Sequence, residues 1–272
     1  MPGEKEGARA LDKFYTRSEI VNLCLGLLRG VAAEKGWAPA LTVEPSAGSG
    51  AFLNALTGPR VGLDLAPEAP GIERADFLTW APPDVPGPIW VVGNPPFGKN
   101  SSLALRFLNR SAGFASVVAF VLPRTFEKAS LQKRIAPRLH LVLQHVLPED
   151  AFTLCGEPLR VPCVFQVWER RDEPRPTPAP VIPHPDFEFV PLARAHFAVQ
   201  RVGVRAGAVK DAPESRSASS HHGVRATGLI AHEVLMRRFE TLDYDSVKRS
   251  TAGNPSIGKG EVISLYRQAF PE

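Results

Sequence analysis

The segment at residues 41–53 constrains the fold most, because a strand, a glycine-bearing turn and a helix follow one another in it. Leu41-Thr42-Val43 is a run of strand length, and the turn after it reaches Gly50, where an apolar helix begins. Glycines let a backbone approach a ligand closely, and the helix behind them offers free N–H groups. The turn lacks the third glycine of the dinucleotide-binding pattern, and a carboxylate at Glu44 would repel a phosphate. We therefore expect a cationic ligand here.

Strand-like and helix-like segments alternate through the first part of the chain. Apolar runs of strand length occupy 60–65, 89–92 and 115–123, and helical patterns occupy 18–36 and 101–111. Near-continuous apolar strands that alternate with helices are typical of a parallel sheet covered on both faces. Residues 139–146 and 161–167 are strand-like with no helix between them, which predicts a hairpin at the sheet edge. The expected fold class is α/β.

Two acidic residues follow at spacings that suit a nucleoside ligand. Asp64, followed by Leu65, ends the second strand about 20 residues after the first, where a partner for ribose hydroxyls is expected. Asp76 can accept a hydrogen bond from an adenine amino group, and the ring of Phe77 can pack on the base. Each acid alone is more often a solvated strand end. Their order and spacing favour the ligand-binding interpretation.

The quartet Asn94-Pro95-Pro96-Phe97 follows an apolar strand, at the edge of an open α/β sheet where ligands bind. The Asn94 side-chain carbonyl and the Pro95 backbone carbonyl are two acceptors that can hold the two hydrogens of a planar –NH2 group. Phe97 offers an apolar face on which a flat substrate can stack. The alternative is a proline loop that closes the strand, with Phe97 in the core. The quartet alone does not decide between them.

Taken together, these motifs resemble the S-adenosylmethionine-dependent N6-adenine DNA methyltransferases of the gamma arrangement, in which cofactor motifs precede the catalytic motif. The resemblance covers residues 10–170 and includes a leading motif at residues 13–21. It implies a Rossmann-like class I methyltransferase fold with a mostly parallel seven-stranded sheet and a small C-terminal α+β region. It also implies S-adenosyl-L-methionine as the cofactor and no metal. The cofactor-binding residues implied are Tyr15, Thr16, Glu44, Pro45, Ser46, Ala47, Gly48, Gly50, Asp64, Leu65, Asp76, Phe77 and Asn94.

The same resemblance assigns the catalytic motif to Asn94, Pro95, Pro96 and Phe97, although Tyr is more usual in the family where this chain has Phe97. It implies methyl transfer to the exocyclic N6 of adenine in DNA, with the base flipped out of the duplex. Phe152 would then pack the far face of the base, and Lys99 would meet a phosphate. The alternatives are that Phe152 folds back onto the hairpin and that Lys99 is simply solvated.

Other activities fit the same motifs. An RNA adenine methyltransferase, or one that methylates a glutamine side-chain amide, would present the same planar –NH2 group to Asn94. A non-catalytic subunit that binds the cofactor for a partner is a third hypothesis, which the intact quartet disfavours. No segment resembles a nuclease, so a role in restriction and modification would need a separate restriction nuclease as a partner.

Composition sets limits on these hypotheses. The chain has 272 residues, enough for one full α/β domain and a smaller region. Its three cysteines form no CxxC pair, so neither a disulfide framework nor a zinc site is indicated. No leading apolar stretch or membrane-length run is present, and we expect a cytoplasmic protein that does not bind membranes. The net charge of +4 permits a nucleic-acid partner without requiring one. The oligomeric state is left open.

A proline-rich segment predicts the domain boundary. We expect a catalytic domain at 1–172, an extended linker at 173–186 and a target-recognition region at 187–272. Residues 197–205 alternate like a strand, which would put Arg201 and Arg205 on one face as substrate-binding residues. An alternating arginine face is often only solvated. The polar stretch at 215–222 is expected to be a loop, whose paired histidines we interpret as solvated and not metal-binding.

Overall fold

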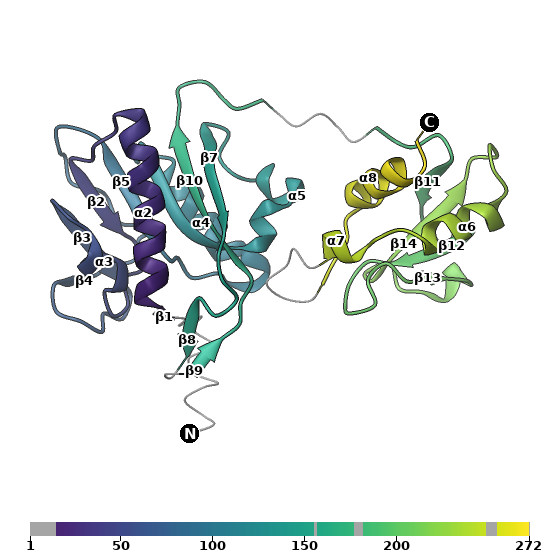
Figure 1. Cartoon of the computed structure of the whole chain (residues 1–272), viewed down its shortest axis with the longest axis horizontal. Coiled ribbons are helices and arrows are strands. Elements are labelled where there is room, and N and C mark those ends of the chain that lie inside the picture. Colours follow the sequence, from purple (N-terminus) through teal and green to yellow (C-terminus); the bar gives the residue numbers. More distant parts are fainter. Residues whose placement is uncertain (1–14, 155–156, 177–181, 249–254, 272) are drawn as a thin grey trace. The chain divides into compact units, whose positions relative to one another are not determined.

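The computed structural model describes residues 15–154, 157–176, 182–248 and 255–271. The chain divides into two compact units, Met1–Thr177 and Pro178–Glu272, which are considered separately (Figure 1). Residues 13–14 of the leading motif, 177–181 of the proline-rich segment and 249–254 of the C-terminal region lie outside the described residues.

Unit 1 is built on a seven-stranded sheet. Neighbouring strands follow the order β4-β3-β2-β5-β6-β10-β7, and every pairing from β4 to β6 is parallel. Only β10 runs antiparallel to its two neighbours, so β10 and β7 form the edge hairpin that the sequence predicted. The prediction of a Rossmann-like α/β fold with a mostly parallel seven-stranded sheet is confirmed. The strands are β2 (Leu41–Glu44), β3 (Arg60–Asp64), β4 (Ile72–Arg74), β5 (Ile89–Gly93), β6 (Val117–Pro123), β7 (Leu139–Val146) and β10 (Cys163–Arg170).

Helices cover both faces of this sheet (Figure 1). Helices α2 and α3 contact each other over one face, and α4 packs on the other. The central strands β5 and β6 are buried along their whole length, because both faces are covered. Helix α2 ends at Gly36, whose left-handed backbone (φ 67°) lets its neighbouring N–H groups return to the last turn. The helices are α2 (Ser18–Lys35), α3 (Ala51–Ala55), α4 (Ser102–Ser111) and α5 (Ala129–Gln132), with short 3₁₀ turns η1 (Lys99–Ser101) and η2 (Arg124–Glu127).

A small three-stranded sheet anchors the leading motif to the edge hairpin. Strand β1 (Tyr15–Thr16) pairs with β8 (Phe152–Leu154), which pairs in turn with β9 (Glu157–Leu159). The backbone N–H of Arg17 donates to Ala151 at 3.1 Å, and the Arg17 guanidinium contacts Asp150 at 2.5 Å. These contacts hold the N-terminal segment against a loop more than a hundred residues later in the chain.

The predicted linker is bound to unit 1 at its beginning. The Arg175 guanidinium donates to the backbone carbonyls of Gln132, Ile135, Ala136 and Leu139, at 2.5 to 2.9 Å. It also lies over the ring of Trp168, 5.9 Å from the centroid. Carbonyls just beyond a short helix lack intrahelical donors, and this one side chain supplies them.

Unit 2 is a separate α+β structure with its own core. An antiparallel sheet of order β11-β14-β12-β13 packs aromatic side chains against helices. The rings of Phe187, Phe239 and Tyr266 meet at centroid separations of 4.9 to 5.3 Å. The elements are β11 (Phe187–Val190), η3 (Leu192–Arg194), β12 (Phe197–Gln200), β13 (Val209–Lys210), η4 (Pro213–Ser215), β14 (His221–Ala226), α6 (His232–Glu240), α7 (Asp245–Lys248) and α8 (Lys259–Ala269).

The expected strand at 197–205 is too long. Strand β12 ends at Gln200, and the chain then turns through Gly203 (φ 89°) and Gly207 (φ 99°), both left-handed. Arg201 is half-buried and Arg205 is exposed on this turn, so they do not share one face of a strand. The alternation of residue types continues past the end of the strand, so the pattern alone overestimates the length of the strand. The glycines are the sequence signal of the turn.

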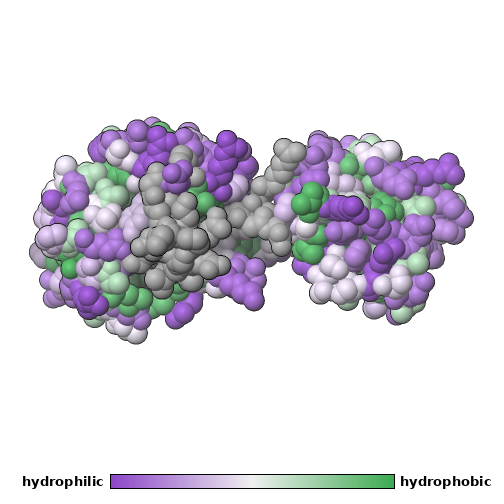
Figure 2. Space-filling view, turned by 90° about the horizontal axis from the view of Figure 1, so that it is seen from below, coloured by the Kyte–Doolittle hydropathy of each residue, from purple (hydrophilic) through white to green (hydrophobic). Residues whose placement is uncertain are grey.

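In the part of the chain that the structure describes, no helix is both long and apolar enough to cross a bilayer. The visible face of each unit is mostly hydrophilic, with scattered apolar patches (Figure 2).

Gly62 on β3 lies where α3 packs closely against the sheet. A methyl group there would lie 2.6 Å from a Leu53 methyl and 3.2 Å from the Cβ of Ala47. We expect Gly62→Ala to lower the free energy of unfolding by about 1–3 kcal/mol, measured by urea denaturation. The control is Gly26→Ala on an exposed part of α2, where a Cβ meets nothing within 4 Å. Equal stability of both variants would contradict this packing.

Candidate active site

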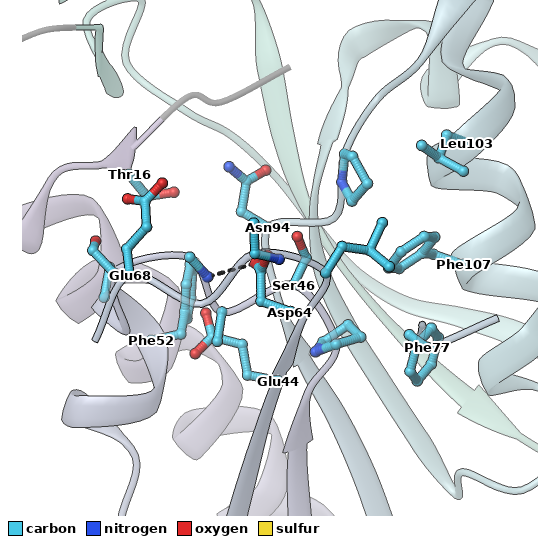
Figure 3. Close-up of a pocket in the computed structure, with 18 of the residues that line it drawn as sticks. Thr16, Glu44, Ser46, Phe52, Asp64, Glu68, Phe77, Asn94, Leu103 and Phe107 are labelled. Carbon is cyan, nitrogen blue, oxygen red and sulfur yellow. Dashed lines mark hydrogen bonds between the residues drawn. The ribbon is translucent and has the colours of Figure 1, made fainter. Parts of the chain in front are cut away.

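A cavity of about 550 Å³ opens at the carboxyl ends of the parallel strands β2, β3 and β5 (Figure 3). Because these ends share one edge of the sheet, the loops that follow the strands converge there. The structure thus brings most of the predicted site residues together. The lining includes Tyr15, Thr16, Glu44, Pro45, Ser46, Ala47, Gly48, Asp64, Leu65, Asp76, Phe77, Asn94, Pro96 and Lys99.

Glu44 lies at the floor of the cavity and is 2% exposed. Its Oε2 accepts the backbone N–H of Leu53 at 2.6 Å, so the carboxyl lies against the first turn of α3. A Cβ at Gly93 would be 3.1 Å from the Glu44 Cγ, so the end of β5 packs directly on this side chain. Burial raises the pKa of Glu44 to about 8, with a further contribution from the nearby Asp64 carboxylate.

Asp64 holds the glycine loop in place. Its Oδ2 accepts the Gly48 N–H at 2.8 Å, drawn as the dashed line in Figure 3, and its Oδ1 accepts the Ala66 N–H at 2.8 Å. The residue predicted to bind ribose hydroxyls therefore also connects the end of β3 to the loop after β2. Carboxylate oxygens have further lone pairs, so these two bonds leave acceptor capacity for a ligand.

Glu68 lines the same cavity, although the sequence analysis did not identify it. Its carboxylate accepts the Tyr15 hydroxyl at 2.6 Å, and its backbone N–H donates to Gly48 at 3.0 Å. It lies in a loop of prolines, alanines and glutamates that matches neither a strand nor a helix pattern, so no sequence signal separated it from an ordinary surface acid. Glu68 lies on the side of the cavity opposite Phe77 (Figure 3).

The other end of the cavity is apolar. Phe77 is 1% exposed and packs against Phe107 of α4 and Phe114, at ring-centroid distances of 5.1 and 6.1 Å. Leu103 and Phe107, one helical turn apart on α4, also line the cavity. Their i, i+4 spacing is the sequence signal from which both residues could have been predicted to share one face of a helix. Asp76 accepts the Leu78 N–H at 2.9 Å and begins the turn after β4.

The predicted catalytic quartet follows β5 directly, and its residues differ in exposure to the cavity. Asn94 and Pro96 line it, whereas Pro95 is buried and is not part of the lining. Phe97 is 6% exposed and Phe152 is fully buried, and their rings meet edge-to-face at 6.3 Å and 84°. A base held between these two rings therefore requires that they separate.

The turn after the quartet has an unusual backbone. Gly98, Asn100 and Ser101 all have positive φ (68°, 55° and 61°), and two of them are not glycine. The Ser101 hydroxyl is hydrogen-bonded to that of Thr125 at 2.8 Å, which ties this turn to the end of β6. Lys99, between Gly98 and Asn100 in this turn, is exposed and lines the cavity.

Six predicted residues are not in the lining: Gly50, Pro95, Phe97, Phe152, Arg201 and Arg205. Gly50 is not in the lining but precedes α3 in a left-handed conformation (φ 87°). Arg201 and Arg205 belong to unit 2. Among the described residues, no three His, Cys, Asp or Glu side chains converge as metal ligands would.

The charge of the cavity favours a cation. Its lining holds the acidic residues Glu44, Asp64, Glu68 and Asp76 but only one basic residue, Lys99. With an apolar slot at Phe77 and carboxylates beside it, the cavity suits a flat ring joined to hydroxyl groups and a positive charge. A nucleotide polyphosphate would be repelled.

Comparison with known proteins gives similarity of structure only. No protein-family model matches the chain, and no curated protein sequence does. A candidate RNA methyltransferase from Pyrococcus horikoshii superposes with a TM-score of 0.43 and 14% identity, covering 59% of this chain and 87% of its own. The N-methyltransferase NodS from Bradyrhizobium japonicum gives 0.37 and 11%, covering 56% and 96%. A methylase candidate from Haemophilus influenzae gives 0.36 and 13%, covering 54% and 88%. These likenesses concern the fold alone.

Glu44 should make the stability of unit 1 depend on pH. In the unfolded chain its carboxyl has the ordinary pKa of 4.5, whereas the folded state retains the proton up to about pH 8. Between these values the folded state binds more protons, so this group's contribution to stability is lost as pH rises. We expect Glu44→Gln to lose less stability than the wild type between pH 5 and pH 8, measured by urea denaturation.

The control for this experiment is Glu34→Gln, an exposed acid on α2 that should keep the wild-type pH dependence. Parallel stability curves for the wild type and Glu44→Gln across this pH range would show that the carboxyl is ionised in the folded protein.

Proposed function

We propose that the protein transfers a methyl group from S-adenosylmethionine to a planar amino group, and that its substrate is the N6 amine of adenine in DNA. The observation that carries the proposal is the convergence of the glycine loop, two strand-end acids and Asn94 with Pro96 around one cavity. The sequence order of these motifs resembles that of N6-adenine methyltransferases, and the parallel register of β2, β3 and β5 supports the same grouping.

The cavity's own residues fit this cofactor. Asp64 and Glu68 have carboxylate oxygens for ribose hydroxyls, and Phe77 with Phe107 forms an apolar surface for the adenine ring. Asp76 is an acceptor for the adenine amino group. Tyr15, bonded to the Glu68 carboxylate, lines the cavity together with Thr16 and Glu44, and these acids suit the positively charged methionine end.

When bound, the cofactor supplies an electrophilic methyl group, so the chain needs no covalent nucleophile. Asn94 and the backbone carbonyl of Pro95 are the acceptors that would orient the two amine hydrogens and direct the nitrogen lone pair towards the cavity. They would also stabilise the positive charge that develops on nitrogen as the bond forms, and that interaction is stronger in the transition state than before it. The amine then loses one proton to solvent.

A flipped base would enter beside Asn94, next to Phe97. Because Phe97 and Phe152 pack on each other, we infer that base entry separates these two rings and replaces their contact with stacking on the base. The Tyr hydroxyl usual at this position is absent, and stacking needs only the ring. Lys99, exposed at the cavity, would meet a phosphate flanking the base.

Asn94→Ala tests the catalytic assignment. Losing the amide acceptor should lower the rate of methyl transfer by about 100-fold or more, since single groups that stabilise a transition-state charge contribute this much. Binding of S-adenosylmethionine, measured by calorimetry, should remain within a few-fold of the wild type because Asn94 is one of many residues in the lining. Asn22→Ala, exposed on α2 outside the cavity, is the matched control.

The substrate is decided by incubating the protein with radiolabelled cofactor and separate pools of duplex DNA, single-stranded DNA, RNA and protein. Label on adenine in DNA supports the proposal as stated. Label on RNA or on glutamine side chains would keep the catalytic assignment and replace the substrate. Wild-type transfer activity in Asn94→Ala would refute the role of the quartet.

A further inference from the structure

A basic cluster lies in unit 2. It consists of Arg201, His222 and Lys259, and the last two lie beside the ring of Phe189. The Lys259 ammonium lies 5.3 Å from the centroid of that ring, and the His222 imidazole lies 5.5 Å from it. The sequence analysis singled out Arg201, as one of a pair with Arg205. It interpreted His222 as solvated, which is wrong, because His222 is 8% exposed and lies on β14.

The three basic residues and Phe189 come from four separate segments of the chain. His222 on β14 pairs with Val199 on β12, and Arg201 follows the end of that strand. The Arg201 carbonyl accepts the Ile257 N–H at 2.8 Å, and the His222 Nε2–H donates to the Ile257 carbonyl at 3.2 Å. Ile257 precedes α8, whose first residue is Lys259. One short segment thus holds the three basic side chains together.

The positive charge of the cluster is not balanced within the described residues. Neither Arg201 nor Lys259 forms an ion pair there, and the Nε of Arg201 is buried without a hydrogen-bond partner. Every charged side chain that acts on His222 is basic: Arg201, Lys259 and His221, together with burial, lower the pKa of His222 to about 4. The acid nearest in sequence, Glu261, accepts the Gly258 N–H at 2.6 Å in the capping box of α8.

Such an arrangement costs stability unless an anion completes it. A buried donor without a partner has lost its hydrogen bond to water, and repulsion between neighbouring like charges adds to that cost. In the same unit, two other arginines are paired: Arg225 with Glu188 at 2.6 Å, and Arg238 with Asp186 at 2.9 Å. An anionic group with two oxygens would pair with both cations of the cluster at once.

We propose that Arg201 and Lys259 bind a backbone phosphate of a nucleic-acid strand. The guanidinium fork of Arg201 would hold the phosphate oxygens, and the ammonium of Lys259, restrained over Phe189, would contact the same phosphate. The choice of nucleic acid rests on the proposed function, because the phosphate would belong to the strand whose base enters the cavity of unit 1.

The test compares two double variants that each remove two positive charges from unit 2. Arg201→Gln with Lys259→Gln alters the cluster, whereas Arg225→Gln with Lys248→Gln removes cations paired with Glu188 and Asp245. Fluorescence anisotropy with labelled single-stranded DNA, duplex DNA and RNA would be measured at several salt concentrations.

We expect the cluster variant to lose affinity at least about tenfold and to show a shallower salt dependence, because both cationic contacts to the phosphate are removed. The control variant should bind within about twofold of the wild type. Arg201→Lys should restore much of the affinity by restoring the charge. Circular dichroism would show that all variants are folded.

Equal weakening in both double variants, or no change in the cluster variant, would overturn the site. So would binding of inorganic phosphate, measured by calorimetry, with no binding of any nucleic acid. Methyl transfer is measured separately on the same pools. Binding that depends on the cluster, without methyl transfer, supports the phosphate site and refutes the proposed function. Methyl transfer without binding that depends on the cluster supports the proposed function and refutes the phosphate site.

Discussion

The buried carboxyl of Glu44 is the contact on which the geometry of the cavity depends. It ends β2, accepts the Leu53 N–H of α3 at 2.6 Å and packs against Gly93 at the end of β5. Three elements that form the cavity therefore meet at one side chain. An acid at this depth is costly to ionise, and a positively charged ligand beside it would offset that cost. The same group can therefore stabilise the empty fold when protonated and attract a cation when ionised.

The sequence predicted the large sheet well because its strands are long, apolar and separated by helices. Strands β2, β5 and β6 were evident from continuous apolar runs, and the edge hairpin was evident from two strands without an intervening helix. The pairing of β1 with β8 was not predicted. A two-residue strand has no periodicity, and the paired residues Tyr15 and Thr153 lie 138 residues apart in the sequence. Only the folded chain brings them together.

The candidate site was predictable where a residue's role follows from its place at a strand end, as with Asp64 and Asn94. It was less predictable where a side chain reaches the cavity from a loop or from a helix on the other face, as with Glu68 and Phe107. The expected arginine face failed for a related reason. Gly203 and Gly207 turn the chain after β12, and the alternation of residue types persisted beyond the strand itself.

The two units carry opposite local charge, which matches what each is proposed to bind. A cavity with four acidic residues and one basic residue attracts a sulfonium but repels the backbone of a nucleic acid. A substrate strand would therefore need cations outside the cavity, and the basic cluster in unit 2 is proposed to supply them. Because the acidic cavity and the basic cluster belong to different units, a cationic cofactor and a polyanionic substrate would each bind to residues of opposite charge. Added salt should then weaken substrate binding through the cluster more than it weakens cofactor binding in the partly enclosed cavity, because exposed charges are screened more strongly than buried ones.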